Sequence, residues 1–185
     1  MPDKPSISLL SRLMLTKKQQ KTLFKWVFYG LFLVALSVVQ DVLLSRVRLF
    51  GATTELVPCA IFLICLIEGT HTGSVFSLTA GLLYLFSGTA PGPYSMVAIT
   101  FLSVGACILR QAFLQESFSS VMLCTAIAMV LYVIVNFAFG LFLGLTRFSR
   151  LHGFFITAIL SLLTVPVFYP VVKAINAFGG HSWKE

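Results

Sequence analysis

Long runs of apolar residues fill almost all of the sequence after Phe24, and the charged residues fall between the runs. Roughly five or six of these runs approach the length of a membrane span, because a hydrocarbon core about 30 Å thick requires about 20 apolar residues per helix. Hydrophobic residues make up 58% of the 185 residues and charged residues only 10%. A soluble core of this size could not bury that much apolar surface. The sequence therefore predicts an all-α integral membrane protein.

Breaks between the apolar runs divide the chain into six predicted helices. Glycine, proline and polar residues mark the breaks, most clearly in segment 88–93, which contains two glycines and two prolines. Pro58 could tilt or kink the short second helix, and Pro166 and Pro170 are expected to bend the last. We expect a basic segment at residues 1–23, a transmembrane domain at 24–178 and a short tail at 179–185. The predicted helices cover residues 24–44, 56–67, 73–87, 94–113, 120–145 and 153–178.

The distribution of basic residues predicts the orientation of the chain. Of the 13 Lys and Arg residues, a six-helix arrangement places nine on the side of the N-terminus, leaving Arg46, Arg48, Arg147 and Arg150 on the other side. Positive charge is enriched in cytoplasmic segments, so both termini are expected in the cytoplasm. Anionic lipid headgroups explain the basic N-terminal segment better than nucleic acid does. This segment could form an interfacial amphipathic helix or a frayed tail.

Four polar residues within or beside the predicted helices are candidates for a functional or structural role. A carboxylate in a span is a functional candidate, although an ion pair with a following arginine is the simpler interpretation for Asp41. Glu68 and His71 have the spacing of a proton-relay pair, but the intervening Gly69 favours a turn. Asn136 lies deep in its helix, where an amide usually hydrogen-bonds to another helix.

The remaining sequence features do not predict catalysis or metal binding. The cysteines lie inside apolar runs without a CxxC motif, and we expect small buried side chains, neither disulfides nor metal ligands. No nucleophile, base and oxyanion arrangement can be assembled, so the chain is not expected to be an enzyme or to hold a cofactor. The four cysteines are Cys59, Cys65, Cys107 and Cys124.

Small residues at four-residue spacing predict two faces for close helix packing. Gly73, Ser77 and Gly81 form the first, which we expect to pack within the helical hairpin. Gly140 and Gly144 form the second, near the end of the fifth predicted helix. We expect this second face to bind a helix of a partner protein.

Several short motifs occur in a fixed order between residues 31 and 175. They begin with Gln40, continue through Thr54-Glu55-Leu56 and Leu66-Ile67-Glu68-Gly69, and end with the segment 81–88 followed by Gly92 and Tyr94. In this order the chain resembles the family of the rod-shape-determining protein MreD. That family usually has Pro-Asp-Leu where Thr54-Glu55-Leu56 stands here. It commonly has an acidic residue at the position of Tyr84, so the resemblance is to a divergent member.

The resemblance implies a fold, a location and a set of partners. It implies a six-helix bundle like that of the substrate-binding components of energy-coupling-factor transporters, in the bacterial inner membrane. Members of the family are non-enzymatic components of the cell-elongation machinery, in contact with membrane lipids. They act with MreC, and through it with MreB and the RodA/penicillin-binding-protein synthase of peptidoglycan.

Two other functions remain as alternatives. A substrate-binding component of an energy-coupling-factor vitamin transporter has a similar size and helix number. Such components usually carry an Ala-x-x-x-Ala surface on the first helix, whereas Ala35 is the only alanine of the first predicted helix. A small proton-coupled transporter or channel would need a series of intramembrane charges, which the sequence lacks.

Overall fold

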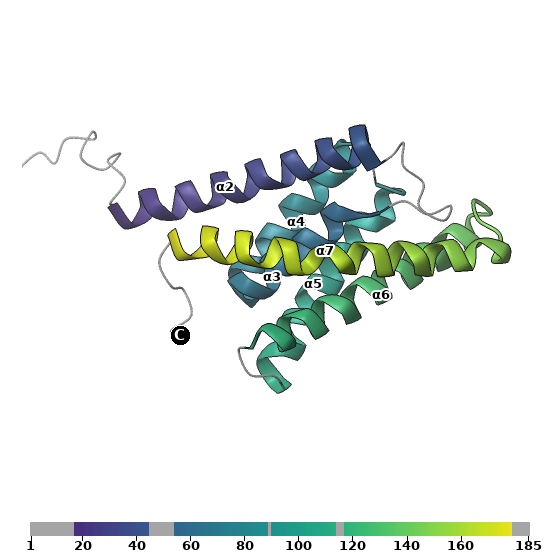
Figure 1. The fold of residues 1–185 in the computed structure, drawn as a ribbon. Coiled ribbons are helices and arrows are strands. Elements are labelled where there is room, and N and C mark those ends of the chain that lie inside the picture. Colours follow the sequence, from purple (N-terminus) through teal and green to yellow (C-terminus); the bar gives the residue numbers. More distant parts are fainter. Residues whose placement is uncertain (1–16, 45–53, 89, 114–116, 179–185) are drawn as a thin grey trace, which may run out of the picture.

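The computed structural model describes residues 17–44, 54–88, 90–113 and 117–178, and these form a bundle of helices (Figure 1). Helix α2 continues into a π-helical turn, and a short 3₁₀ turn precedes α7. The helices are α2 (Lys17–Val39), the π-helical turn (Gln40–Leu44), α3 (Leu56–Glu68), α4 (Thr70–Phe86), α5 (Pro93–Phe113), α6 (Phe118–Phe142), the 3₁₀ turn (Phe148–Arg150) and α7 (Leu151–Phe178).

All six predicted helices are confirmed, most of them to within three residues at each end. The predicted helix start at Phe24 is wrong, because α2 already includes Lys17. Lysine and glutamine are good helix formers, so the polar residues before the apolar run extend the helix. The predicted interfacial helix or tail at the N-terminus falls largely on residues 1–16, which lie outside the described residues.

Helix α3 is the centre of the bundle. All of its residues are buried, and it packs against α2 and against each helix from α4 to α7. A helix that is apolar all round must be covered on every side. Its 13 residues span only about 20 Å, so it is shorter than a hydrocarbon core of about 30 Å. Pro58 lies in its first turn, where a missing N–H breaks no helical hydrogen bond.

Helix α2 lies at the edge of the bundle and is mostly exposed (Figure 1). Val27, Leu31, Val34 and Val38 are each more than half exposed, and they recur at helical spacing. In water such a surface would be unfavourable, but in a bilayer it faces acyl chains.

Four helical segments are long and apolar enough to cross a membrane: Gln19–Val42, Pro93–Gln111, Phe118–Phe142 and Phe148–Phe178. Helices α3 and α4 are shorter.

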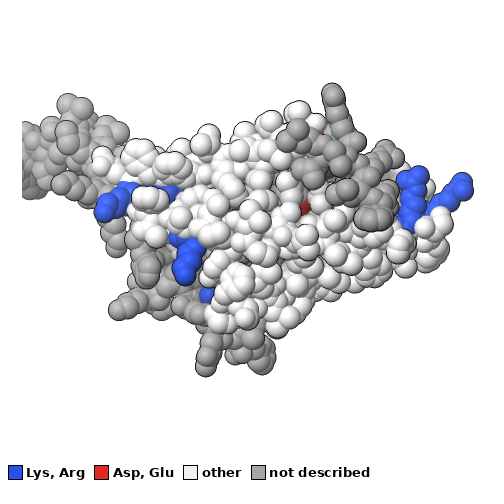
Figure 2. Space-filling view, viewed as in Figure 1, with Lys and Arg blue, Asp and Glu red and all other residues white. Residues whose placement is uncertain are grey.

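Successive helices alternate in direction, so the bundle has two distinct ends. We call them the Lys25 end and the Gln40 end. Lys25 contacts the last residue of α3 and Asn176 near the end of α7, whereas Gln40 contacts the first residues of α3. The described chain therefore begins and ends at the Lys25 end (Figure 1). On the face shown in Figure 2, lysines and arginines gather at both ends, and the surface between them is almost free of charge.

Candidate functional site

Each end of the buried helix α3 carries a carboxylate. Glu68 is its last residue, at the Lys25 end, and Glu55 immediately precedes its first residue, at the Gln40 end. Because α3 is short and wholly buried, both ends lie inside the protein. A carboxylate in such a place requires a counter-charge, hydrogen-bond donors or a proton. The two ends meet this requirement differently.

At the Lys25 end, Glu68 is fully paired. Lys25 Nζ lies 2.6 Å from Glu68 Oε2, and Tyr29 Oη donates a 2.7 Å hydrogen bond to Oε1. Lys25 Nζ also donates to Asn176 Oδ1 at 3.2 Å. The side chains of Lys25 and Glu68 are 5% and 1% exposed, so water screens the pair very little. This network joins α2, α3 and α7.

Arg110 reinforces the same end of α3. Its guanidinium donates a hydrogen bond to the backbone carbonyl of Leu66, and Gly69 N–H bonds to the carbonyl of Cys65. A positive charge near the last turn complements the negative end of the helix dipole. Gly69 has a φ of +89°, which allows the chain to reverse between α3 and α4 without a strained side chain. The predicted helical hairpin is confirmed.

At the Gln40 end, side chains of other helices cap α3. Gln40 Oε1 accepts hydrogen bonds from the N–H groups of Leu56 (2.8 Å) and Val57 (3.1 Å). The backbone N–H of Glu55 donates to Ser161 Oγ on α7 at 2.9 Å. These bonds satisfy N–H groups that a helix start leaves without partners. They fix the start of α3 between α2 and α7.

The Glu55 carboxyl group has no comparable partners. Its Oε2 is buried without a hydrogen bond among the described residues, and the same holds for Tyr132 Oη, Asn136 Oδ1 and Thr54 Oγ1. Tyr132 and Asn136 are 0% and 4% exposed. Burial raises the pKa of Glu55 from 4.5 to about 7, and the nearby Tyr132 hydroxyl offsets part of that shift. We call Glu55, Tyr132 and Asn136 the Glu55 cluster.

Tyr84 lies beside the Glu55 cluster. It is 1% exposed, and it is close enough to Glu55, Tyr132 and Asp41 for electrostatic interaction with each. Two carboxylates from earlier parts of the chain, Asp41 and Glu55, therefore lie near this tyrosine.

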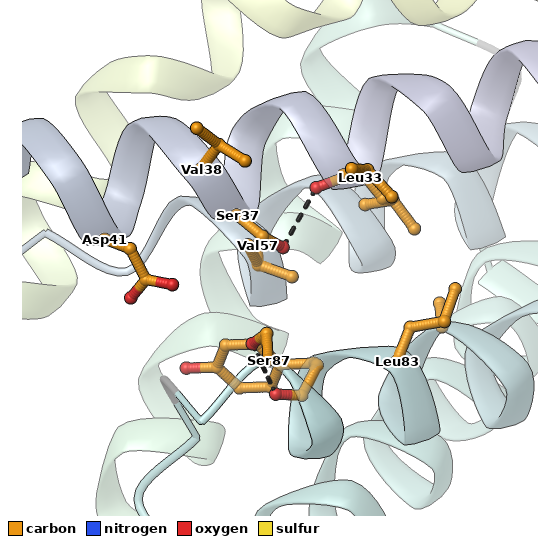
Figure 3. Close-up of a pocket in the computed structure, with 10 residues that line it drawn as sticks. Leu33, Ser37, Val38, Asp41, Val57, Leu83 and Ser87 are labelled. Atoms are coloured by element: carbon orange, nitrogen blue, oxygen red, sulfur yellow. Dashed lines mark hydrogen bonds between the residues drawn. The ribbon is translucent and has the colours of Figure 1, made fainter.

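A groove of about 250 Å³ lies between α2 and α4, with Val57 of α3 beneath it (Figure 3). We call it the α2–α4 groove. Its walls are mostly apolar, and its polar groups lie toward the Gln40 end. The Ser37 and Ser87 hydroxyls there donate to carbonyls of their own helices, and Asp41 is exposed beside them. The lining residues are Leu33, Val34, Ser37, Val38, Asp41, Val57, Ala80, Leu83, Tyr84 and Ser87.

The structure separates the polar residues that the sequence singled out. Asp41 faces the α2–α4 groove, and the arginines predicted to pair with it lie outside the described residues. His71 is exposed while Glu68 is buried with Lys25, so the two do not form a relay pair. The Asn136 amide nitrogen bonds to the Tyr132 carbonyl of its own helix, so the predicted bond to another helix is not seen there.

The first predicted small-residue face packs inside the bundle, as expected. A Cβ added at Gly73 would lie 2.7 Å from the Cys65 carbonyl oxygen, and one at Gly81 would lie 3.3 Å from the Met96 side chain. Ser77 is fully buried. This face therefore lets α4 approach both α3 and α5.

The second predicted face, Gly140 with Gly144, is not a continuous helix face. Helix α6 ends at Phe142, and Gly144 follows it with a φ of +71°. The Gly140 carbonyl accepts hydrogen bonds from Leu145 and Thr146, which closes the turn. The two glycines therefore end the helix, and Gly144 is needed because left-handed backbone is unfavourable for other residues.

The predicted burial of the cysteines is confirmed. All four are buried and free. Cys65 and Cys107 lie side by side, with their sulfur atoms 3.2 Å apart. Among the described residues, no group of three or more His, Cys, Asp and Glu side chains is arranged to hold a metal ion.

Sequence reasoning missed several residues of these two sites. Lys25 and Tyr29 were not among the polar candidates that the sequence indicated. Tyr132 gave no signal within a uniformly apolar run. Gln40 appeared only as a motif position, and its role as a cap depends on where α3 begins.

In comparisons with known proteins, the chain matches no family model, no curated protein and no solved structure.

Proposed function

We propose that the chain is a non-enzymatic membrane scaffold of the bacterial cell-elongation machinery that binds a helix of an MreC-like protein in the α2–α4 groove. Through that partner it would support MreB, the RodA/penicillin-binding-protein synthase and rod shape. The groove is the observation that carries the proposal, together with the sequence resemblance. It opens sideways, since Val34, Val38 and Leu83 on its rim are 53%, 54% and 52% exposed.

A transmembrane helix suits this groove. Lipid removes most of the hydrophobic drive for helix association, so a partner helix requires close packing and a few polar contacts. Ala80 provides a small side chain in the wall, and Asp41 and two serines provide polarity at one end. The groove replaces the Gly140 and Gly144 face as the proposed contact, because those glycines close a turn.

We further propose that the chain passes through the inner membrane six times, with the short α3 enclosed by the other helices, and that both termini are cytoplasmic. Three observations support this orientation: the described chain begins and ends at the Lys25 end, the helices alternate in direction, and basic residues gather there. Lys21, Lys25, Arg110 and Lys173 lie at this end, whereas Arg147 and Arg150 lie at the other. Cytoplasmic ends of membrane helices carry the excess of positive charge.

Filling the groove tests the proposed contact. Val34→Trp and Val38→Trp place a large ring in the groove, and we expect each to weaken co-purification with the MreC-like protein by about ten-fold or more, a loss of about 1.4 kcal/mol. Val167→Trp on α7 is the matched control, because Val167 is 66% exposed and lies outside the groove. Full partner binding by both groove variants, with expression like that of the control, would exclude this contact.

The alternative function is the substrate-binding component of a vitamin transporter. The unpartnered polar atoms of the Glu55 cluster favour it, because they face the interior of the bundle and could contact a small ligand. A binding screen of the purified protein with vitamins separates the two functions. Tight vitamin binding without partner binding would favour the transporter component over the scaffold.

A further inference from the structure

The carboxylates at the two ends of α3 differ in one respect: the buried Glu68 has a counter-ion from the chain, and the half-buried Glu55, whose Oε2 is buried, has none among the described residues. Lys25 neutralises Glu68. Glu55 has no Lys or Arg partner among the described residues, and its Oε2 has no hydrogen bond there. A buried carboxylate without a partner is unfavourable by several kcal/mol. The Glu55 cluster is therefore incomplete as the side chains stand.

The unpartnered atoms around Glu55 are all oxygens. Glu55 Oε2 and Asn136 Oδ1 are acceptors, and Tyr132 Oη offers lone pairs as well as a proton. Tyr132 lies close enough to Glu55 and to Asn136 to interact with both, yet these three oxygens are buried without a hydrogen bond of good geometry in the described part of the chain. A single ion bound between these oxygens would give each of them a partner. Oxygen atoms alone are the ligand set that hard cations prefer.

The charge of the site selects the valence of the ion. One carboxylate balances one positive charge, whereas a divalent ion would leave a net charge in a low-dielectric interior. Asp41 also acts on Tyr84, but it is exposed on the α2–α4 groove and is accessible to solvent ions. The positive end of the α3 dipole favours the ionised form of Glu55.

We propose that the Glu55 cluster binds a monovalent metal cation such as Na⁺ through Glu55 Oε2, Tyr132 Oη and Asn136 Oδ1. The ion joins the start of α3 to α6, as Lys25 joins the end of α3 to α2 and α7. Sequence reasoning assigned no ion to this chain, and the site is separate from partner binding in the groove.

The test measures thermal unfolding of the full-length protein in detergent micelles. The buried cysteines supply the signal, because a thiol-reactive dye labels them only when the fold opens. NaCl is titrated against N-methylglucamine chloride at constant ionic strength and about pH 8, where Glu55 is mostly ionised because its pKa is about 7. We expect the Tm of the wild-type protein to rise with Na⁺ and to saturate.

Variants assign the response to the cluster. Glu55→Gln is expected to abolish it, and Tyr132→Phe is expected to raise the half-saturating Na⁺ concentration by about ten-fold or more. Tyr29→Phe is the matched control, because it removes a hydroxyl that is equally buried at the other end of α3. It is expected to keep the half-saturating concentration.

Three outcomes would overturn the proposal. The first is a Tm that does not depend on Na⁺ at this pH, which would mean that water or a proton, and not a metal ion, occupies the cluster. The second is an equal Na⁺ response in the wild-type protein and in Glu55→Gln, which would place the ion elsewhere. The third is loss of the response in both single variants, Tyr29→Phe and Tyr132→Phe, which would show that the response follows overall stability and not the cluster.

Discussion

Replacing Lys25 by methionine tests the buried ion pair that holds the Lys25 end together. Methionine keeps most of the apolar stem but leaves Glu68 with Tyr29 as its remaining described hydrogen-bond donor. The Glu68 side chain is only 1% exposed, so water cannot replace the lost charge without opening the bundle. Removing one member of a buried pair costs about 3–5 kcal/mol. We expect Lys25→Met to lower the free energy of unfolding by about that amount.

The measurement is equilibrium unfolding in mixed micelles of a denaturing detergent, carried out as a double-mutant cycle. Glu68→Gln in the Lys25→Met background removes the unpaired charge and still offers an oxygen to Tyr29, so it should recover most of the loss. Lys21→Met is the matched control, because Lys21 is exposed one turn earlier in α2, and it should change the free energy by no more than about 0.5 kcal/mol. A loss below about 1 kcal/mol in Lys25→Met would refute the reasoning.

Three further perturbations follow from the structure. Gln40→Leu leaves the first two N–H groups of α3 without their acceptor, so it should lower stability by about 2 kcal/mol and speed hydrogen exchange of those amides. Gly144→Ala forces a side chain into left-handed backbone and should lower the free energy of unfolding by about 1–2 kcal/mol without changing partner binding. The control is Gly105→Ala, where the added methyl group meets open space and should not lower the Tm. A cysteine at Pro91 should react with an impermeant reagent from outside and one at Lys184 only from inside; the reverse pattern would exclude cytoplasmic termini.

The helices themselves could be predicted from the sequence, because their limits depend on local chemistry. Apolar run length fixes the number of helices, and glycine, proline and polar clusters mark the turns at residues 69 and 88–93. The central place of α3 follows from its composition, since 13 residues without a polar face cannot lie at a surface in contact with headgroups. The start of α2 was misplaced because it was put where the apolar run begins, and the helix continues into the lysines and glutamines before that run.

The ion pair could not be predicted, because Lys25 and Glu68 are 43 residues apart. Their contact depends on the rotation of α2 about its axis and on the depth at which α3 docks. Neither quantity is encoded in a local pattern. Four lysines within nine residues look alike in the sequence, and only packing selects Lys25 for burial. The Glu55 cluster could not be predicted for the same reason, because it combines residues from the start of α3 and from α6.

The two glycines at the end of α6 were misinterpreted for a different reason. Gly140 and Gly144 have the spacing of a helix-packing motif, but the same spacing places a glycine just beyond a helix end. Thr146 and Arg147, which follow shortly after Gly144, were the signal that could have decided between a packing motif and a helix end. A packing motif requires the helix to continue through both glycines, and α6 ends at Phe142.

The short length of α3 explains why the polar residues of this chain gather where they do. A helix that does not reach across the bilayer must bury both of its ends, and each buried end needs polar partners from the surrounding helices. At the Lys25 end the chain itself supplies a lysine that pairs with Glu68. At the Gln40 end it supplies oxygens and a carboxylate but no cation among the described residues. Tyr84 lines the α2–α4 groove and also lies beside Glu55 and Tyr132. Tyr84 therefore belongs both to the wall of the groove and to the surroundings of the Glu55 cluster, although the three proposed ion ligands do not line the groove.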